Sequence, residues 1–173
     1  KLADYGELEL DMTVSEFIPE FETMNIGRLC GDQVEILYPA KKKITIRHLL
    51  THSSGLGSGP LGIHIYYTLP PSERKSLAEV TAYYAKSPLE FEPGSSQCYS
   101  GIHGFDVLAR VAELAAGESF SSFLEKEIFL PIGMEDTTFS PTEEQLERVV
   151  PMHTFEGGIG KRVEFPSGSL FEG

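Results

Sequence analysis

The sequence has few cysteines, few basic residues and no long apolar run. Its two cysteines, Cys30 and Cys98, allow at most one disulfide and form no disulfide framework, so they leave the redox compartment open. No apolar run approaches about 18 residues, so the sequence predicts no membrane-spanning segment. Fourteen Lys and Arg against 26 Asp and Glu give a net charge of −12, which argues against nucleic acid as a partner because its phosphates are also negative.

The composition is that of a folded chain. Of 173 residues, 40% are hydrophobic and 10% are aromatic, which are proportions of a globular domain that buries its own core. The spacing of apolar residues predicts a single domain over residues 1–173 that is mainly α with short β-strands (α+β). Helices are expected at 13–18, 45–50, 76–86, 102–116, 119–128 and from Ser140, a loop at 55–62, a strand at 34–38, and a hairpin of 149–155 with 161–165.

The stretch 92–101 leads into the strongest helix signal of the chain. Its Pro-Gly pair predicts a turn, after which small polar residues lead to the hydroxyl of Tyr99. The helix that follows, 102–116, is expected to end at Gly117, where glycine can adopt a left-handed conformation. Tyr99 supports two interpretations: an acid–base catalyst whose pKa is lowered by nearby cations, or a side chain that packs its ring and hydrogen-bonds through its hydroxyl.

Two other patterns resemble catalytic motifs but are expected to be structural. His48 and His52 have the spacing of a zinc-binding helix, but Leu49 stands where a metalloprotease needs glutamate, so hydrogen-bonding and capping roles are favoured and no metal site is expected. Ser72 and Lys75 fit Ser-x-x-Lys, yet their surroundings are polar, whereas a catalytic lysine needs a desolvated site. We therefore expect a solvated helix start there.

Patterns for nucleotide binding and for a nucleophile elbow are also missing. The glycine-rich segment 55–60 lacks the last glycine of a dinucleotide fingerprint, and no strand is expected before it. Gly-x-Ser-x-Gly does not occur in the sequence. The sequence therefore predicts no bound cofactor.

A set of six short segments, in one order along the chain, carries a family resemblance. The segments are Leu8–Phe21, Ile44–Leu56, Pro88–Gly94, Tyr99-Ser100, Phe105–Leu108 and Phe129–Phe139, with a weaker one at 167–171. Together they resemble the serine β-lactamase superfamily, in the branch of class C β-lactamases, D-Ala-D-Ala carboxypeptidases and esterase-like proteins. The resemblance covers about residues 2–140.

This resemblance implies a fold in which both ends of a longer chain build an antiparallel sheet and a helical domain is inserted between them. The present sequence would be that helical domain, without most of the central sheet. Residues 1–6 would be the tail of the upstream nucleophile helix, and residues 149–173 would begin the return to the sheet. The remaining N- and C-terminal segments of the parent would be its partners, and the N-terminal one would hold the Ser-x-x-Lys pair. The family is often secreted or in the cell envelope, but the sequence leaves its compartment open.

The resemblance places one part of the active centre in this sequence, Tyr99 and Ser100. Tyr99 would relay a proton between the nucleophile and the leaving group, with Ser100 as its neighbour. Family members usually continue with asparagine, whose carboxamide binds substrate and the lysine, but this chain has Gly101. The expected parent is a serine hydrolase that acts through an acyl-enzyme on an ester, a D-amino-acid peptide or a β-lactam, and this chain alone would be inactive. The alternative is a non-catalytic binding domain on the same scaffold.

Overall fold

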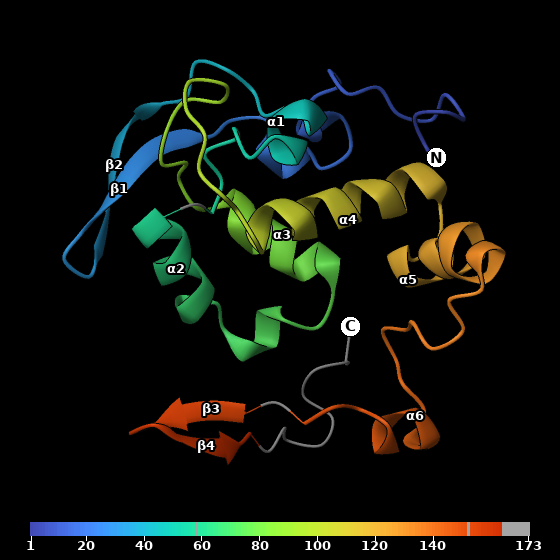
Figure 1. Cartoon of the computed structure of the whole chain (residues 1–173). Coiled ribbons are helices and arrows are strands. Elements are labelled where there is room, and N and C mark those ends of the chain that lie inside the picture. The colour runs from blue at the N-terminus through green and yellow to red at the C-terminus, as the bar shows by residue number, and fades with distance from the viewer. Residues whose placement is uncertain (58, 152, 164–173) are drawn as a thin grey trace. The chain divides into compact units, whose positions relative to one another are not determined.

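The chain is mostly helical and carries two small antiparallel sheets, which confirms the predicted fold class. A computed structural model describes residues 1–57, 59–151 and 153–163, and Figure 1 shows its elements. Two compact units are present, Lys1–Phe123 and Leu124–Gly173. That residues 1–173 act as one inserted domain stays a prediction.

The elements follow one another in a regular succession of short helices and hairpins. Among the described residues, no helix combines the length and the apolar character that crossing a bilayer requires. In chain order the elements are η1 (Val14–Glu16), η2 (Pro19–Phe21), β1 (Asn25–Cys30), β2 (Gln33–Pro39), α1 (Ile46–Leu50), α2 (Gly59–Thr68), η3 (Pro71–Glu73), α3 (Leu77–Ala85), α4 (His103–Ala116), α5 (Phe120–Leu124), the π-helical turn η4 (Glu125–Phe129), η5 (Leu130–Ile132), α6 (Glu143–Glu147), β3 (His153–Glu156) and β4 (Ile159–Arg162).

Helix α4 is the centre of the first unit and packs against both α3 and α1. Its fully buried side chains include Val107 and Val111, which lie four residues apart on one face. Gly117 ends the helix in the left-handed conformation with φ of 70°, as predicted. The helical spacing of apolar residues in the sequence also predicts that Phe105 is buried, and this was wrong, because its side chain is 47% exposed.

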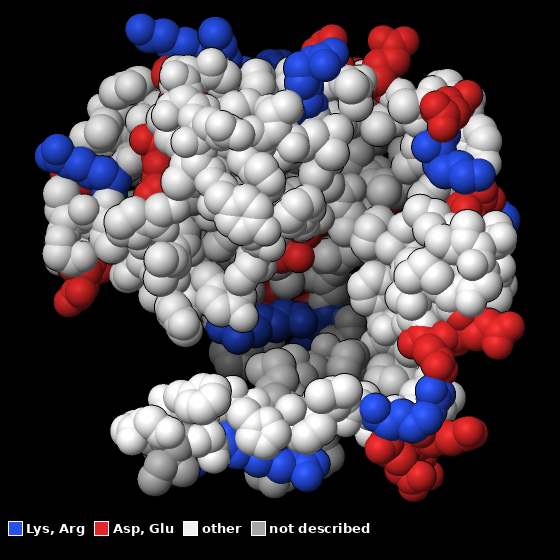
Figure 2. Space-filling view, viewed as in Figure 1, with Lys and Arg blue, Asp and Glu red and all other residues white. Residues whose placement is uncertain are grey.

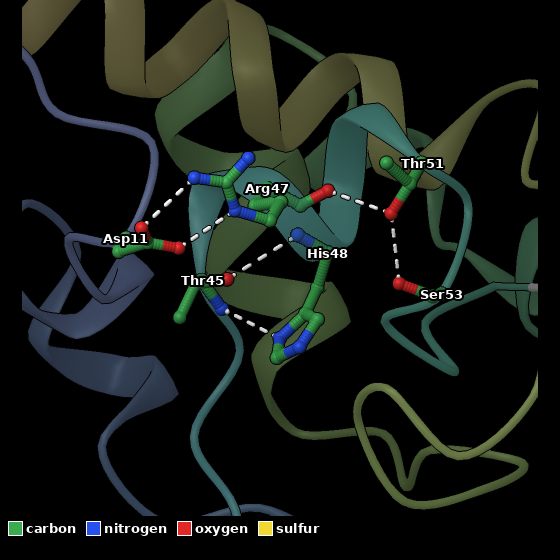
Figure 3. Close-up of polar contacts among 6 residues, drawn as sticks. All are labelled: Asp11, Thr45, Arg47, His48, Thr51 and Ser53. Atoms are coloured by element: carbon green, nitrogen blue, oxygen red, sulfur yellow. Dashed lines mark hydrogen bonds and ion pairs between the residues drawn. The ribbon is translucent and has the colours of Figure 1, made fainter.

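Helix α1 is joined to the N-terminal segment by the backbone hydrogen bonds that open the helix. Its first two N–H groups, of Ile46 and Arg47, donate to the carbonyls of Met12 and Leu10 at 3.1 and 2.8 Å. These donors have no partner within the helix, so the N-terminal segment satisfies them. The Arg47 guanidinium also forms a two-bond ion pair with Asp11, at 2.7 and 2.8 Å (Figure 3).

Thr45 caps α1, as predicted. Its hydroxyl accepts from the N–H of His48 at 3.3 Å, and its own N–H donates to His48 Nδ1 at 3.2 Å (Figure 3). His48 thus takes the place that glutamate or glutamine has in a capping box. Because Nδ1 accepts this hydrogen bond, His48 is a structural residue of the helix start.

The expected strand at 34–38 lies within β2, which pairs with a strand that the pattern did not predict, β1. The pairing of β1 with β2 has a register shift between Ile26 and Gly27. A Cβ on Gly27 would lie 2.6 Å from Pro88 Cγ, so glycine allows the close approach of Pro88 to the strand. Leu89 completes the contact, since its carbonyl accepts from the Gly27 N–H at 2.8 Å. Cys30, at the end of β1, and Cys98 are both free thiols.

The loop expected at 55–62 was partly wrong, because α2 begins at Gly59. A Cβ on Gly62 would lie 2.3 Å from the backbone of Gly57, so this glycine lets the helix pack directly on the preceding loop. Glycines that the pattern assigned to a loop therefore provide close packing. The sequence predicts a capping box of Ser76 with Glu79 at the start of α3, and half of it is present. The Ser76 hydroxyl accepts from the Glu79 N–H at 3.3 Å, but the Glu79 carboxylate accepts from the Lys75 N–H at 3.1 Å.

In the second unit the expected hairpin is confirmed, with Gly157 and Gly158 in its turn at φ of 60° and 81°. The expected helix start at Ser140 was wrong. Thr142 caps α6 and forms a capping box with Gln145. Residues 164–173, and with them the end of the expected segment 149–173, lie outside the described residues.

The expected tail of an upstream helix, residues 1–6, forms a single backbone turn. The Tyr5 N–H donates to the Lys1 carbonyl at 2.9 Å, and Gly6 follows with φ of 78°. This is how a helix commonly ends. That the turn continues a nucleophile helix stays a prediction.

Replacing Leu49 with alanine should lower the free energy of unfolding of the chain by about 2–5 kcal/mol, because this side chain is 1% exposed and its removal leaves a cavity. Leu50→Ala is the matched control, since Leu50 is 50% exposed and its truncation should cost less than about 1 kcal/mol. Urea denaturation followed by circular dichroism measures both. Equal losses would mean that α1 does not pack as described.

Candidate functional site

The predicted site residues lie immediately before α4, where Tyr99 and Ser100 have opposite environments. The Tyr99 side chain is 70% exposed, whereas Ser100 is 2% exposed. The Tyr99 ring contacts the ring of His52, with a centroid separation of 4.7 Å and an interplanar angle of 54°. The structure therefore presents the phenol to solvent and anchors the next residue in the interior.

The segment that carries Tyr99 is held by the loop that follows α1. The carbonyl of His52 accepts from the Cys98 N–H at 3.0 Å, and its Nδ1 accepts from the Ser100 N–H at 3.4 Å. Gln97 adds a third bond, from its side-chain amide to the carbonyl of Thr51 at 3.2 Å. These bonds surround Tyr99 on both sides, so the backbone that positions the phenol is fixed.

His52 makes these bonds from a left-handed backbone conformation. Its φ is 54°, and among the described residues other than glycine no further positive φ occurs. Such a conformation costs about 1–2 kcal/mol for a residue with a Cβ. The strain is offset by the two hydrogen bonds to the segment 98–100, so His52 is a positioning residue for Tyr99. Sequence reasoning missed this role, because the residue type carries only a weak signal for positive φ.

Ser100 connects the site to α4. Its hydroxyl accepts from the N–H of Gly104 at 3.0 Å and so satisfies one of the free donors at the start of the helix. A Cβ on Gly104 would lie only 3.2 Å from this hydroxyl, which explains the glycine. The structure thus gives Ser100 a positioning contact, and a direct part in the chemistry stays a prediction.

Gly101 stands next to the Tyr99 ring. A Cβ at this position would lie 2.7 Å from Tyr99 Cε1, closer than two carbon atoms can approach. Any other residue at position 101 would therefore displace the phenol ring from where it lies. The absence of a side chain here determines how Tyr99 is placed.

Tyr99 lines a cavity of about 380 Å³ between α2 and the residues that lead into α4. This volume falls in the range of small-molecule sites. None of the described residues in its lining is Lys, Arg, Asp or Glu. The lining residues are Gly57, Gly59, Gly62, Ile63, Tyr66, Tyr67, Tyr99, Gly101, Ile102 and His103.

Behind this cavity lies a buried polar cluster of α3 and α4. The Tyr84 hydroxyl donates to Asp106 at 3.1 Å, and the Tyr84 ring lies 4.1 Å from the ring of His103. Burial raises the pKa of Asp106, against the opposing effect of the hydrogen bond from Tyr84. Burial and the Asp106 carboxylate raise the pKa of Tyr84.

His103 is the most unusual member of this cluster. Its side chain is 3% exposed, and its Nε2 has no hydrogen-bond partner among the described residues. Burial lowers its pKa to about 4, so the ring is neutral near pH 7. Sequence reasoning missed this residue, because no local pattern distinguishes it from the rest of the helix.

The other sequence candidates lie apart from this site. His48 caps α1, and the described residues contain no group of three His, Cys, Asp or Glu side chains that could hold a metal ion. Ser72 and Lys75 are both exposed around η3, as expected of a solvated helix start. Ser53, after α1, shares a hydrogen bond with Thr51 at 2.8 Å (Figure 3).

Comparison with known proteins gives a consistent picture. A family model described as Beta-lactamase matches residues 1–169. Lovastatin esterase of Penicillium rubens is 34% identical over 91% of this chain and 41% of its own length. Esterase EstB of Burkholderia gladioli is 36% identical over 88% of this chain and 37% of its own length. The solved structure of EstCE1, a hydrolase with promiscuous acyltransferase activity, has a TM-score of 0.73 and 25% identity over 98% of this chain and 44% of that chain. The chain thus spans about two-fifths of the length of these relatives.

Replacing His52 with alanine should lower the free energy of unfolding by about 1–3 kcal/mol, because it removes the acceptor for the Ser100 N–H and leaves alanine in the left-handed region. His52→Asn is the matched variant, since asparagine tolerates this conformation and its amide oxygen can accept the bond. Denaturation should show that asparagine restores at least half of the loss. If both variants lose the same amount, His52 does not hold the segment in this way.

The buried His103 should make stability depend on pH. Its pKa in the folded chain, about 4, is below the ordinary value of 6.5, so between these values the unfolded chain binds more protons and stability falls as the pH falls. The raised pKa of Asp106 acts in the opposite direction, so the comparison must isolate His103. His103→Leu should gain up to about 3 kcal/mol relative to the unchanged chain between pH 7.5 and 4. A stability difference that stays constant across this range would contradict the assignment.

Proposed function

This chain belongs to the beta-lactamase family, and we propose that it forms part of a serine hydrolase that cleaves carboxylic esters through an acyl-enzyme. The observation that carries the proposal is the exposed Tyr99 phenol, which lines a cavity of small-molecule size. The N–H groups of its neighbours Cys98 and Ser100 donate to the carbonyl and to Nδ1 of His52. The choice of an ester is supported by the two relatives that are named as esterases. The serine nucleophile and its lysine would come from the segment of a longer parent that precedes residue 1.

In this proposal Tyr99 moves one proton in each half of the reaction. As the serine oxygen attacks the ester carbonyl carbon, Tyr99 takes the serine proton as a phenolate, and the resulting phenol gives this proton to the alcohol oxygen when the carbon–oxygen bond breaks. In the second half a water molecule attacks the acyl carbon and gives its proton to Tyr99, which returns it to the serine oxygen. A catalyst in this role must accept and release a proton at a fixed place, which is what the rigid segment 97–100 provides.

The glycine at position 101 bears on the choice of substrate. The resemblance implies an asparagine carboxamide at this place that binds substrate and lysine, and Gly101 has none. This difference disfavours β-lactams and leaves esters and D-amino-acid peptides open, and the relatives that are named as esterases favour esters. The same difference supports the second candidate function, a non-catalytic binding domain on the same scaffold.

Tyr99→Phe in the longer protein should reduce ester hydrolysis by about 10²- to 10⁴-fold, because the phenol oxygen that transfers the proton is gone. Tyr38→Phe is the matched control, since Tyr38 is an exposed tyrosine of β2 whose side chain does not line the cavity. Initial rates with 4-nitrophenyl butyrate, a β-lactam and a D-Ala-D-Ala peptide measure both activity and preference. Equal rates for Tyr99→Phe and the unchanged protein would remove Tyr99 from the mechanism.

Covalent labelling separates the hydrolase from the binding domain. The longer protein should react with a fluorophosphonate probe, and replacement of its nucleophilic serine should abolish the label. The 173-residue chain alone should hydrolyse 4-nitrophenyl acetate no faster than its own Tyr99→Phe variant. A longer protein that neither takes the label nor hydrolyses any of the three substrates would favour the binding domain.

A further inference from the structure

Helix α2 forms one wall of the cavity beside Tyr99, and it carries no charged residue of its own. Between Gly59 and Thr68 its sequence contains no Lys, Arg, Asp or Glu, so neither end has a charged group of the helix itself to complement the helix dipole. Figure 2 shows a surface over α2 that is largely free of these four residue types. Charged partners for the two helix ends must therefore come from other segments.

The first turn of α2 is capped by Glu90, which belongs to a distant segment. The Leu61 N–H, which has no acceptor within the helix, donates to Glu90 Oε1 at 3.0 Å. The side chain just before a helix normally accepts from this position, and here a carboxylate 29 residues further along the chain does so. Gly59 allows this approach, since a Cβ there would lie 2.9 and 3.1 Å from the two carboxylate oxygens.

The backbone that carries Glu90 is fixed by β1 and by the loop after α1. The Glu90 N–H donates to the carbonyl of Gly55 at 2.9 Å. The preceding residue, Leu89, is fully buried, its N–H donates to the Asn25 carbonyl and its carbonyl accepts from the Gly27 N–H, both at 2.8 Å. The carboxylate that caps α2 therefore extends from an immobilised backbone.

Arg74 closes the other end of α2. Its guanidinium donates to the carbonyls of Leu69 and Tyr66 at distances from 2.9 to 3.3 Å and lies over the Tyr66 ring, 5.7 Å from its centroid. Carbonyls at a helix end have no N–H partner within the helix, so Arg74 satisfies them from outside. A carboxylate at the N-terminus and a guanidinium at the C-terminus also have the signs that the helix dipole favours.

From this arrangement we propose that Glu90 and Arg74 are positioning residues of the active centre, which hold α2 at its two ends and so fix the cavity wall that faces Tyr99. This inference rests on the proposed hydrolase function. Tyr66 of α2 lines the cavity together with Tyr99, whereas neither Glu90 nor Arg74 is among the described residues of the lining. His52 holds the phenol through separate contacts. Loss of either α2 contact should therefore weaken substrate binding and leave proton transfer intact.

Amide hydrogen exchange in the 173-residue chain tests the cap without requiring catalysis. Glu90→Met keeps the length of the side chain and removes the acceptor, so the Leu61 N–H should exchange at least about tenfold faster. Glu90→Gln keeps an acceptor oxygen and should restore most of the protection. Glu79→Met is the matched control, since the Glu79 carboxylate accepts from the Lys75 N–H at 3.1 Å at the start of α3 and its loss should leave Leu61 unchanged. Unaltered exchange of Leu61 in Glu90→Met would overturn the inference.

Kinetics of the longer protein test the positioning role. Glu90→Met and Arg74→Met should each lower kcat/KM for 4-nitrophenyl butyrate about fivefold to tenfold and leave kcat within about twofold, because binding changes and proton transfer does not. Glu90→Gln should recover at least half of the lost kcat/KM, and Glu79→Met should change neither value. A variant that only lowers stability reduces kcat at constant KM, because fewer molecules are active, and titration with a fluorophosphonate probe measures that fraction.

The outcomes distinguish this inference from the proposed function. Unchanged kcat/KM in both Met variants, or a loss confined to kcat, would overturn the positioning role and leave the hydrolase intact. Equal ester hydrolysis by the unchanged longer protein and its Tyr99→Phe variant would instead overturn the proposed function, and the positioning role with it. The exchange of Leu61 would still establish whether Glu90 caps α2.

Discussion

The contact of His52 with the chain before α4 is the constraint on which the site depends. A residue held at a positive φ directs both its carbonyl and its Nδ1 toward the N–H groups of Cys98 and Ser100. Neither bond involves the side chain of Tyr99, whose ring contacts the ring of His52 instead. A strained residue that persists because its surroundings determine it is a recurring feature of functional sites. Here the strain is located one ring contact away from the proposed catalyst.

The hydrophobic core holds both sides of the contact between His52 and the segment 98–100. Ser100 binds the first turn of α4, and the same helix buries Val107 and Val111 against α1 and α3. The loop that contains His52 follows α1 directly, so both partners of the contact are anchored in one core. The hydrogen-bonded pair of Tyr84 and Asp106 adds a polar contact between α3 and α4. The elements that position Tyr99 are therefore anchored in the same core.

Local signals in the sequence predicted much of the fold, and non-local packing accounts for what they missed. The cap of α1, the glycine end of α4 and the hairpin of the second unit depend on neighbouring residues, so their patterns could be read directly. Strand β1 and helix α2 contain Gly27 and Gly62, whose purpose is close approach to Pro88 and Gly57, and no local pattern shows this. In the site, Tyr99 was predicted from its motif, whereas His52 and His103 depend on contacts with distant segments.

Gly101 lacks the carboxamide that the family usually has at this position, and it also affects where the Tyr99 ring can lie. Because a Cβ at position 101 would lie 2.7 Å from Tyr99 Cε1, a side chain there would require the exposed ring to shift. A side chain there would move the ring and would occupy space next to the cavity that Gly101 and Tyr99 both line. The missing side chain of Gly101 thus removes a polar contact with the substrate and leaves that space open. A single position couples where the phenol lies to which group can lie beside it, and this coupling links the proposed chemistry to the proposed substrate class.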